Sequence, residues 1–474
     1  MRKHLLATAA TALLLSGCSL MPTYERPAAP VPATYGASAA DSAGAPASAP
    51  QTLAPPAWKD YFTDPRLQQL IALALDNNRD LRMATLAIEQ ARAQWQIQRS
   101  AQWPQIGLGA NAARAPNSSG NLSNTYSVGG ILSAWELDFF GRLGSLKEQA
   151  LAQYLASEEG RNAAQTSLIA AVASAWLALQ ADEEGLDISR RTLATREESL
   201  ALMKLRLDVG TASELDYRQV QSLTEAARVT LAQQQRQRAL NENALALLLG
   251  QPLPPELRAS LPGSRLIEVP SMTALPAGLP SDLLAHRPDI RQAELQLKAA
   301  NANIGAARAA FFPRISLTAQ AGTASSELSE LFKSGTWAFS PTLSALLPIF
   351  DAGRNQAGLQ AAQAGRDMAV AQYEKSIQSA FREVSDALAS QGTLDEQLRA
   401  SQAQLQAEQA RLRLAQLRYD NGVASYLDLL DAQRSLFSLE QAVVQVRLQQ
   451  LQNQVQLYKA LGGGWPAPEA QALL

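Results

Sequence analysis

The sequence RLDVGTASELD at residues 206–216 returns 212 positions later as RYDNGVASYLD at residues 418–428. The same offset continues through residues 206–250 and 418–462, where 14 of 45 aligned residues are identical without a gap. In both places a short turn with Gly and Ser separates two segments that have the composition of long helices. The stretch therefore predicts that one chain contains two copies of a helical hairpin.

The repeat extends upstream of these hairpins. With an offset of 209, residues 75–108 align with residues 284–317. The chain is thus predicted to consist of two copies of one unit, residues 67–250 and 279–462, joined by a Pro-rich linker at 251–280. A repeat of about 180 residues is too long for a solenoid and indicates a body with internal pseudo-twofold character.

Each copy is predicted to run as helix, two strands, very long helix, turn and helix. In the first copy, Arg142–Asp208 contains no Pro, and its 67 residues would span roughly 100 Å as a helix. Two shorter helices, 67–101 and 212–249, would together match that length. This pattern favours a mainly α, rod-like body. At the turns, Gly suits a left-handed C-cap and Ser suits an N-cap.

The long helix carries an apolar stripe with a strict period of seven. A sustained period of seven predicts left-handed supercoiling against a neighbouring helix. Asp182, Ser189 and Arg196 occupy the second position of the pattern, where a simple two-helix coil needs Leu. Both a closed ring of helices and a plain coiled-coil rod are compatible with this pattern. The stripe is Val172, Leu179, Leu186, Leu193, Leu200 and Leu207, and its second copy is Val384, Gln391, Leu398, Leu405, Leu412 and Tyr419.

Residues 104–140 and 313–350 lie between the helices and alternate apolar with polar side chains, as two-faced strands do. Strands of about 10 residues suit a tilted crossing of the outer membrane, although a hairpin packed on the helices has the same pattern. Four strands cannot close a barrel in lipid. A membrane location therefore predicts an oligomer. Two chains would give eight strands, and three would give twelve, enough to leave a lumen.

The N-terminus has the pattern of a lipoprotein signal peptide at residues 1–17, with a short apolar core that ends in Leu-Ser-Gly before Cys18. This pattern implies cleavage before Cys18 and a covalent lipid on its sulfur, and Ser19 favours the outer membrane. Residues 18–66 form a lipid anchor and a tether rich in Pro and Ala. The tether could be a disordered spacer or a strap laid along the body. Residues 463–474 are a C-terminal tail.

Composition excludes several classes of function. The 474 residues carry a net charge of −2, with 41 Lys and Arg against 43 Asp and Glu, which argues against nucleic acid as a partner. One Cys and two His argue against a disulfide framework, a zinc cluster or a Ser-His-Asp site. His286 is therefore expected to be structural. With no nucleotide-binding loop or acid–base pair in the sequence, we expect no enzyme activity.

Five motifs carry a resemblance to a known family. They are WELDFFGR at 135–142, SDLLAHRPDI at 281–290, IGAARAAFFP at 304–313, LDAQRS at 430–435 and YKALGGGW at 458–465. Together they resemble the TolC-type outer-membrane efflux ducts, specifically the lipoprotein branch that serves resistance-nodulation-division multidrug pumps. The resemblance covers nearly the whole mature chain.

The resemblance implies the fold, the location and the partners. It implies a homotrimer that closes a 12-strand transmembrane β-barrel and extends a long α-barrel into the periplasm. The chain would be lipid-anchored in the outer membrane, with palmitate among its acyl chains, and would need no cofactor beyond the lipid on Cys18. A periplasmic adaptor protein and an inner-membrane resistance-nodulation-division pump would be its partners. It would conduct drugs passively to the cell exterior, with antibiotic resistance as the consequence.

The resemblance also assigns roles to the hairpin turns. The two tips would form the periplasmic end and contact the adaptor through Gly210, Thr211, Ser213, Gly422, Val423 and Ser425. Leu427 and Asp431 are four residues apart, so they share one helix face, which the resemblance turns toward the lumen. Three chains would then place a ring of Leu and a ring of repelling Asp near a closable entrance. Tyr419 and Asp420 would brace the closed state, although Asp431 could also be an ordinary solvated residue.

Two other functions remain open on sequence alone. The chain could be a duct for protein secretion or metal-ion export, because cargo is chosen mostly by the pump. It could also be a lipid-anchored structural rod of the envelope, which would need no pore.

Overall fold

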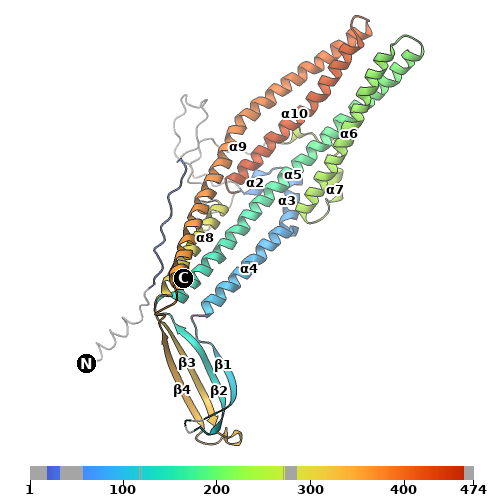
Figure 1. The fold of residues 1–474 in the computed structure, drawn as a ribbon. Coiled ribbons are helices and arrows are strands. Elements are labelled where there is room, and N and C mark those ends of the chain that lie inside the picture. The colour runs from blue at the N-terminus through green and yellow to red at the C-terminus, as the bar shows by residue number, and fades with distance from the viewer. Residues whose placement is uncertain are drawn as a thin grey trace. The chain divides into compact units, whose positions relative to one another are not determined.

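The computed structural model describes residues 19–32, 57–116, 118, 120–270, 272 and 286–463. The described chain is mainly helical with four strands, as the sequence predicts (Figure 1). It divides into two compact units. The strand unit comprises residues 19–29, 85–160 and 289–376, and the hairpin unit comprises residues 30–32, 57–84, 161–288 and 377–463 within the described ranges.

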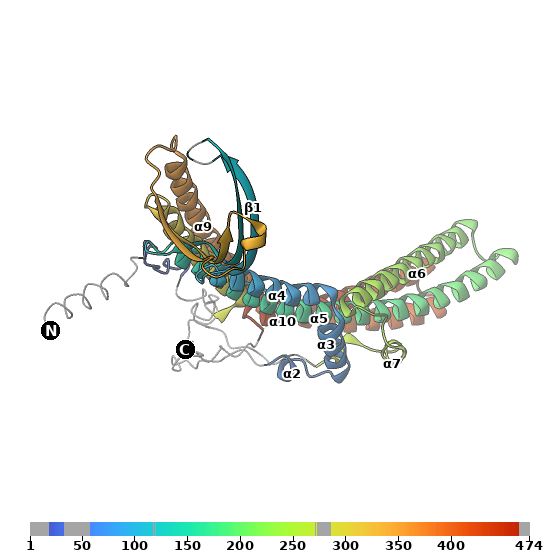
Figure 2. The same cartoon turned by 90° about the horizontal axis from the view of Figure 1, so that it is seen from below.

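The strand unit contains one antiparallel sheet of four strands in the order β1-β2-β3-β4. The strands are β1 (Ile106–Pro116), β2 (Leu122–Leu137), β3 (Arg314–Ser325) and β4 (Trp337–Leu346). In the described chain each edge strand, β1 and β4, pairs on one side alone. The sheet is therefore open at both edges, and it is strongly curved (Figure 2).

The register of the sheet separates apolar from polar side chains. Leu317 on β3 lies opposite Leu343 on β4 and Trp135 on β2, whereas Ser316 lies opposite Ser344. A β-bulge between Leu132 and Trp135 shifts the register by one residue, so both side chains stay on the same face despite their odd spacing. One face of the sheet is thus largely apolar across all four strands, and the other carries mostly small and polar residues, with Ile131 and Leu346 as exceptions.

Aspartate side chains accept backbone hydrogen bonds at the starts of both long helices of the strand unit. Asp138 accepts a hydrogen bond from the backbone N–H of Gly144 at 2.7 Å, and Asp351 accepts one from Asn355 at 2.8 Å. These bonds satisfy amides that the first turn of a helix leaves unpaired. The helices of the unit are α4 (Arg79–Ser100), α8 (Pro288–Ala309) and the first parts of α5 (Arg142–Asp208) and α9 (Arg354–Asp420).

The hairpin unit is a bundle of long helices with short helices packed against it. Its long helices are the remaining parts of α5 and α9 together with α6 (Glu214–Leu249) and α10 (Tyr426–Ala460). The short helices are α2 (Trp58–Tyr61), α3 (Pro65–Asn77), α7 (Pro255–Ala259) and η1 (Leu266–Glu268). In the core, Trp176 is fully buried, and the rings of Tyr61 and Tyr458 stack at 4.6 Å.

The period-seven stripe lies inside the bundle, as predicted. Val172, Leu179 and Leu186 are buried, and the later members of the stripe are half-buried. By length and composition one stretch of α5 could cross a membrane, but half of that stretch is buried among other helices. Packing in the bundle therefore accounts for its apolar character.

The polar positions of α5 each bind a neighbouring helix. Asp182 accepts a hydrogen bond from Asn241 on α6 at 2.5 Å, and Ser189 accepts one from Gln441 on α10 at 3.3 Å. Arg196 donates to the carbonyl oxygen of Leu223 on α6 at 2.8 Å. Helix α5 is thus flanked by two helices, which explains why a plain two-helix coil pattern fails there.

Candidate functional site at the hairpin tips

The two hairpin tips share one backbone conformation. We call the α5–α6 pair hairpin 1 and the α9–α10 pair hairpin 2. Gly210 and Gly422 have left-handed φ values of 75° and 70°, as predicted for C-caps. The amide of Thr211 donates to Arg206 O, and the amide of Val423 donates to Arg418 O, both at 2.8 Å. These bonds close the last turns of α5 and α9 in the same way.

The second helix of each hairpin begins with a capping box. Ser213 Oγ accepts from the amide of Asp216 at 3.1 Å, and the Asp216 carboxylate accepts from the Ser213 amide in return. Ser425 and Asp428 form the same reciprocal pair. The predicted N-caps are therefore confirmed. The box stabilises each turn without help from other parts of the chain.

All six predicted contact residues are exposed at the turns, three on each tip. Apolar side chains are exposed at both tips. Leu215 on hairpin 1 is 67% exposed and Val423 on hairpin 2 is 68% exposed. Small residues and exposed apolar side chains suit a surface that another protein covers. The structure leaves the role of the six residues in adaptor contact as a prediction.

Asp431, one of the predicted gate residues, is held between two arginines. Its carboxylate pairs with Arg411 on α9 and with Arg434 one turn further along α10, both at 2.6 Å. We call these three residues the arginine bracket. The hydrogen bond from Arg411, followed by that from Arg434, holds the pKa of Asp431 below its usual range. Leu427, on the same face one turn before Asp431, is 60% exposed.

The bracket bears on the predicted ring of repelling carboxylates, which stays a prediction. Arg411 also pairs with Glu408 at 2.8 Å, so two cations and two anions sum to zero charge around Asp431. Repulsion among Asp431 side chains of several copies would be reduced accordingly. Sequence reasoning missed both arginines. The three-residue spacing to Arg434 is a visible helix signal, but Arg411 lies 20 positions away on another helix.

Of the two predicted bracing residues, Tyr419 bridges the hairpins, whereas the bracing role of Asp420 stays a prediction. The Tyr419 hydroxyl accepts a hydrogen bond from Arg206 on α5, whose guanidinium lies 5.5 Å from the centre of the tyrosine ring. Asp420 accepts a hydrogen bond from Gln416 within α9 at 2.8 Å. This hydrogen bond joins residues one turn apart in the same helix.

An apolar cluster joins the hairpins behind the tips. Met203 on α5, Val220 on α6 and Leu430 on α10 pack together and are buried. Tyr426 packs against this cluster, and burial raises the pKa of its hydroxyl. The Arg206–Tyr419 bond and this cluster are thus two contacts that hold the tips in the arrangement seen here.

Two further predictions concern metals and the lipid anchor. Within the part of the chain that the structure describes, no group of three His, Cys, Asp or Glu side chains could hold a metal ion. The leader at 1–17 and the lipidation site Cys18 lie outside the described residues, as do most of the tail and residues 33–56 of the tether.

The structure describes residues 19–32 at the start of the tether. The first part of this segment lies along α8 as a strap, not as a free spacer. It runs antiparallel to α8. Arg26 pairs with Glu294 near the start of α8 at 2.7 Å, Asn301 donates to the carbonyl of Pro22 at 2.8 Å, and Arg308 donates to the carbonyl of Leu20 at 3.2 Å. Three contacts spaced seven residues apart on α8 keep to one face of the helix.

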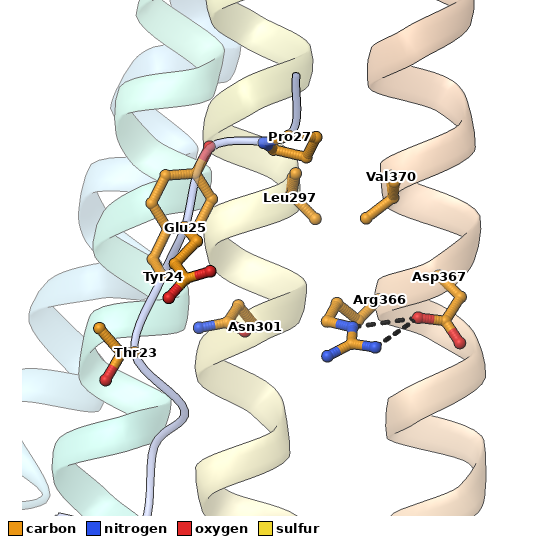
Figure 3. Close-up of a pocket in the computed structure, with 9 residues that line it drawn as sticks. All are labelled: Thr23, Tyr24, Glu25, Pro27, Leu297, Asn301, Arg366, Asp367 and Val370. Carbon is orange, nitrogen blue, oxygen red and sulfur yellow. Dashed lines mark hydrogen bonds and ion pairs between the residues drawn. The ribbon is translucent and has the colours of Figure 1, made fainter. Parts of the chain in front are cut away.

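Glu294 is the main anchor of the strap. Its side chain is 9% exposed and also accepts hydrogen bonds from Tyr24 and Lys298. Beyond the strap, a groove of about 490 Å³ extends toward Arg366, Asp367 and Val370 on α9 (Figure 3). The strap therefore forms one wall of an open groove on the strand unit.

Comparison with known proteins gives matches over nearly the whole chain. Residues 70–251 and 279–463 each match the family described as Outer membrane efflux protein. The toluene efflux pump outer membrane protein TtgF of Pseudomonas putida is 48% identical over 100% of this chain and 99% of its own length. The antibiotic efflux pump outer membrane protein ArpC of Pseudomonas putida is 46% identical over 100% of this chain and 98% of its own length.

Solved structures give the same result. The open state of the MtrE outer membrane channel of Neisseria gonorrhoeae matches with a TM-score of 0.82 and 41% identity, over 94% of this chain and 98% of that channel. The strands and helices described above are thus those of an outer membrane channel fold.

Proposed function

The chain belongs to the outer membrane efflux protein family, and from this premise we propose that it is the outer-membrane channel of a tripartite multidrug efflux system. It conducts drugs and solvents passively from the periplasm to the exterior. The observation that carries this function is the four-stranded sheet with one apolar face and two open edges. Its relatives, which are named for toluene and antibiotic efflux, support the same cargo class.

The sheet requires partners of its own kind. A sheet in lipid cannot leave its backbone edges unpaired, and β1 and β4 are edges here. We infer that β1 of one copy pairs with β4 of the next. Three copies then close a 12-strand barrel, which is wide enough for a lumen. The channel is accordingly a homotrimer.

The internal repeat explains how the helices would continue the passage. Elements of the two copies have matched lengths, with 67 residues in both α5 and α9 and 22 in both α4 and α8. Three chains with two such copies each would arrange their helices as a pseudo-sixfold ring. This ring is the proposed periplasmic α-barrel, with hairpin 2 carrying the closable entrance.

The strap supports lipid anchoring at Cys18. Leu20 is held beside Arg308 near the end of α8, and β3 begins at Arg314. Cys18 is two residues before Leu20, a reach of at most about 7 Å. The anchor would therefore enter the membrane close to the point where the barrel begins. No cofactor other than this lipid and no catalytic activity belong to the proposal.

The tips are the proposed contact with a periplasmic adaptor protein, and through it with an inner-membrane pump that supplies the energy. The support is local. Both turns are stabilised by their own capping boxes, so their exposed faces can bind without refolding. The partner pump would be of the resistance-nodulation-division class, as the sequence resemblance implies.

Reconstitution of the purified full-length protein in planar bilayers tests this function. We expect threefold particles in electron micrographs and a low conductance that rises in the double variant Leu427→Ala with Asp431→Ala. The matched control is Leu215→Ala with Gln219→Ala at the equivalent positions of hairpin 1. A structural rod would give no conductance in either variant, and equal increases in both variants would contradict the gate assignment.

A further inference from the structure

A small cavity lies between the two hairpins, behind the tips. Its volume is about 170 Å³, and α5, α9 and α10 all contribute to its walls. Leu412, Leu436 and Phe437 make its apolar part, while Thr192 and Arg196 make a polar part on α5. The space is smaller than the 300 Å³ or more of a pocket for a drug-sized ligand. A single small ring or a short branched chain is therefore the largest ligand that it can enclose.

Arg196 supplies an unusual charge to this cavity. The residue is 7% exposed, and its guanidinium lies 5.2 Å from the ring centre of Phe437. It donates to the carbonyl oxygen of Leu223, but within the described residues no carboxylate lies within ion-pair distance of it. Burial lowers the pKa of its guanidinium. A buried cation of this kind favours an anion beside it.

The other charged groups at and beside the cavity are Arg191, Glu440 and Asp187. Arg191 pairs with Asp187 at 3.2 Å and also acts electrostatically on Glu440. Burial raises the pKa of Glu440, with Arg191 lowering it and Asp187 raising it. Arg191 therefore already has carboxylates as partners, whereas Arg196 contacts a carbonyl oxygen and an aromatic ring, so an added anion would find its pairing partner in Arg196.

We propose that this cavity binds a small organic monocarboxylate with an apolar body, such as a single-ring aromatic acid. The carboxylate would pair with Arg196 beside the hydroxyl of Thr192, and the ring would lie among Leu412, Leu436 and Phe437. A neutral or cationic ligand of the same shape would leave the charge of Arg196 unpaired. The site should therefore discriminate by charge.

Such a ligand would act on the contact between the hairpins. Its cation comes from α5 of hairpin 1 and its apolar walls come mostly from hairpin 2. A ligand that binds only while both walls are together stabilises that arrangement. A bound carboxylate should therefore hold the tips as they are in this structure.

Equilibrium dialysis of radiolabelled benzoate against the detergent-solubilised full-length protein tests the site. We expect one saturable site per chain that benzyl alcohol does not compete for. Arg196→Gln should weaken the affinity at least about tenfold, because a hydrogen bond to a charged group is lost. Arg196→Lys should retain part of the affinity, and Arg413→Gln, which alters an exposed arginine of α9, should retain all of it.

A second variant keeps the test independent of Arg196. Leu436→Trp fills the cavity and should abolish benzoate binding while Arg196 stays in place. Equal competition by benzyl alcohol, or unchanged binding in Arg196→Gln, would overturn the proposal in favour of an apolar cavity. Absence of saturable binding to the unaltered protein would show a cavity that holds solvent only.

Spin labels at Thr211→Cys and Val423→Cys test the effect on the tips. Benzoate should narrow the distance distribution between the labels in the otherwise unaltered protein and leave it unchanged in Arg196→Gln. Benzoate binding that leaves the distance distribution between the labels unchanged would refute the coupling between the hairpins. None of these measurements requires conductance, so their failure and the failure of the channel function are distinguishable.

Discussion

Hairpin 1 and hairpin 2 have the same backbone and different side chains around it. Both turns use a left-handed Gly, the same pair of amide hydrogen bonds and the same Ser–Asp capping box. Where hairpin 2 has Arg411, Asp431 and Arg434, hairpin 1 has Ser199, Gln219 and Ser222. The repeated sequence therefore specifies the turn, whereas the charged bracket is present in hairpin 2 and absent at the equivalent positions of hairpin 1.

This separation has a physical basis. A capped turn depends on bonds within about ten residues, so both copies can keep it whatever surrounds them. The bracket joins α9 to α10 and affects how the helices of hairpin 2 stand against one another. Hairpin 2 is therefore the copy in which a gate can be adjusted.

Charge reversal in the bracket should have the largest effect. Arg411→Glu places a third carboxylate beside Glu408 and Asp431. We expect the open fraction in planar bilayers to rise roughly two- to fivefold for each chain, the effect of losing an exposed ion pair. Because three chains line one entrance, the combined increase should be at least about tenfold.

The equivalent change in hairpin 1 is the matched control for charge reversal. Ser199→Glu places a carboxylate at the equivalent position of α5, where no bracket exists; it changes the charge by one unit instead of two and should change the open fraction less than about twofold. The double variant Arg411→Glu with Asp431→Arg restores opposite charges and should recover most of the closed state. Equal effects of Arg411→Glu and Ser199→Glu would show that the hairpins do not differ as gates.

Loss of the Arg206–Tyr419 bridge between the hairpins should have a smaller effect than charge reversal in the bracket. Tyr419→Ala removes both the hydroxyl that Arg206 binds and the ring beneath its guanidinium, contacts worth about 1 kcal/mol or slightly more together. We expect faster hydrogen exchange at the ends of both α5 and α9. Tyr419→Phe keeps the ring and should give roughly half of the change. Faster exchange confined to α9 would contradict a bridge.

The shared turns should respond equally to the same change. Gly210→Ala and Gly422→Ala each force a side chain into the left-handed region, where the cost is about 1–2 kcal/mol. An added Cβ would meet no atom within 4 Å at either position, so the cost is conformational in both. Hydrogen exchange at the last turns of α5 and α9 should accelerate to a similar extent. Gly→Asn at either position should restore part of the protection, because Asn tolerates this conformation.

Sequence patterns predicted much of the fold because the signals are local. The long Pro-free segments, the period-seven stripe and the alternating strands all report on neighbours within a few residues. These patterns predicted α5 with its observed bounds, the four strands and the two N-capping serines. The outer membrane efflux family was also predicted correctly, from motifs spread along the chain.

Side-chain partners across helices could not be predicted in the same way. Arg411 reaches Asp431 from another helix, and Arg206 reaches Tyr419 across 213 positions. The strap is a similar case, since Arg26 and Glu294 are 268 positions apart. No periodic pattern marks such pairs, because they depend on how the helices pack. Asp420 shows a local partner of the kind that helix spacing can predict, since Gln416 donates to it from one turn back.

The response to pH should be the smallest difference between the hairpins over the physiological range. The arginines lower the pKa of Asp431 in the folded protein. A carboxylate with a lowered folded pKa stabilises the fold fully above its unfolded value, about 3.9, and loses that contribution as the pH falls through the folded value. Between pH 5 and 8 the open fraction of the unaltered channel should therefore follow that of Asp431→Asn, apart from a constant offset. The two open fractions should converge only below about pH 4.

The comparison for this pH response is Gln219→Glu in hairpin 1, because Gln219 itself does not titrate. A carboxylate without the two arginines should lose its charge nearer its ordinary pKa, about 4.3. If Asp431 instead governed opening near pH 6, the guanidinium partners would not be in place in the closed channel, and the distinction between the two hairpins would rest on the backbone alone.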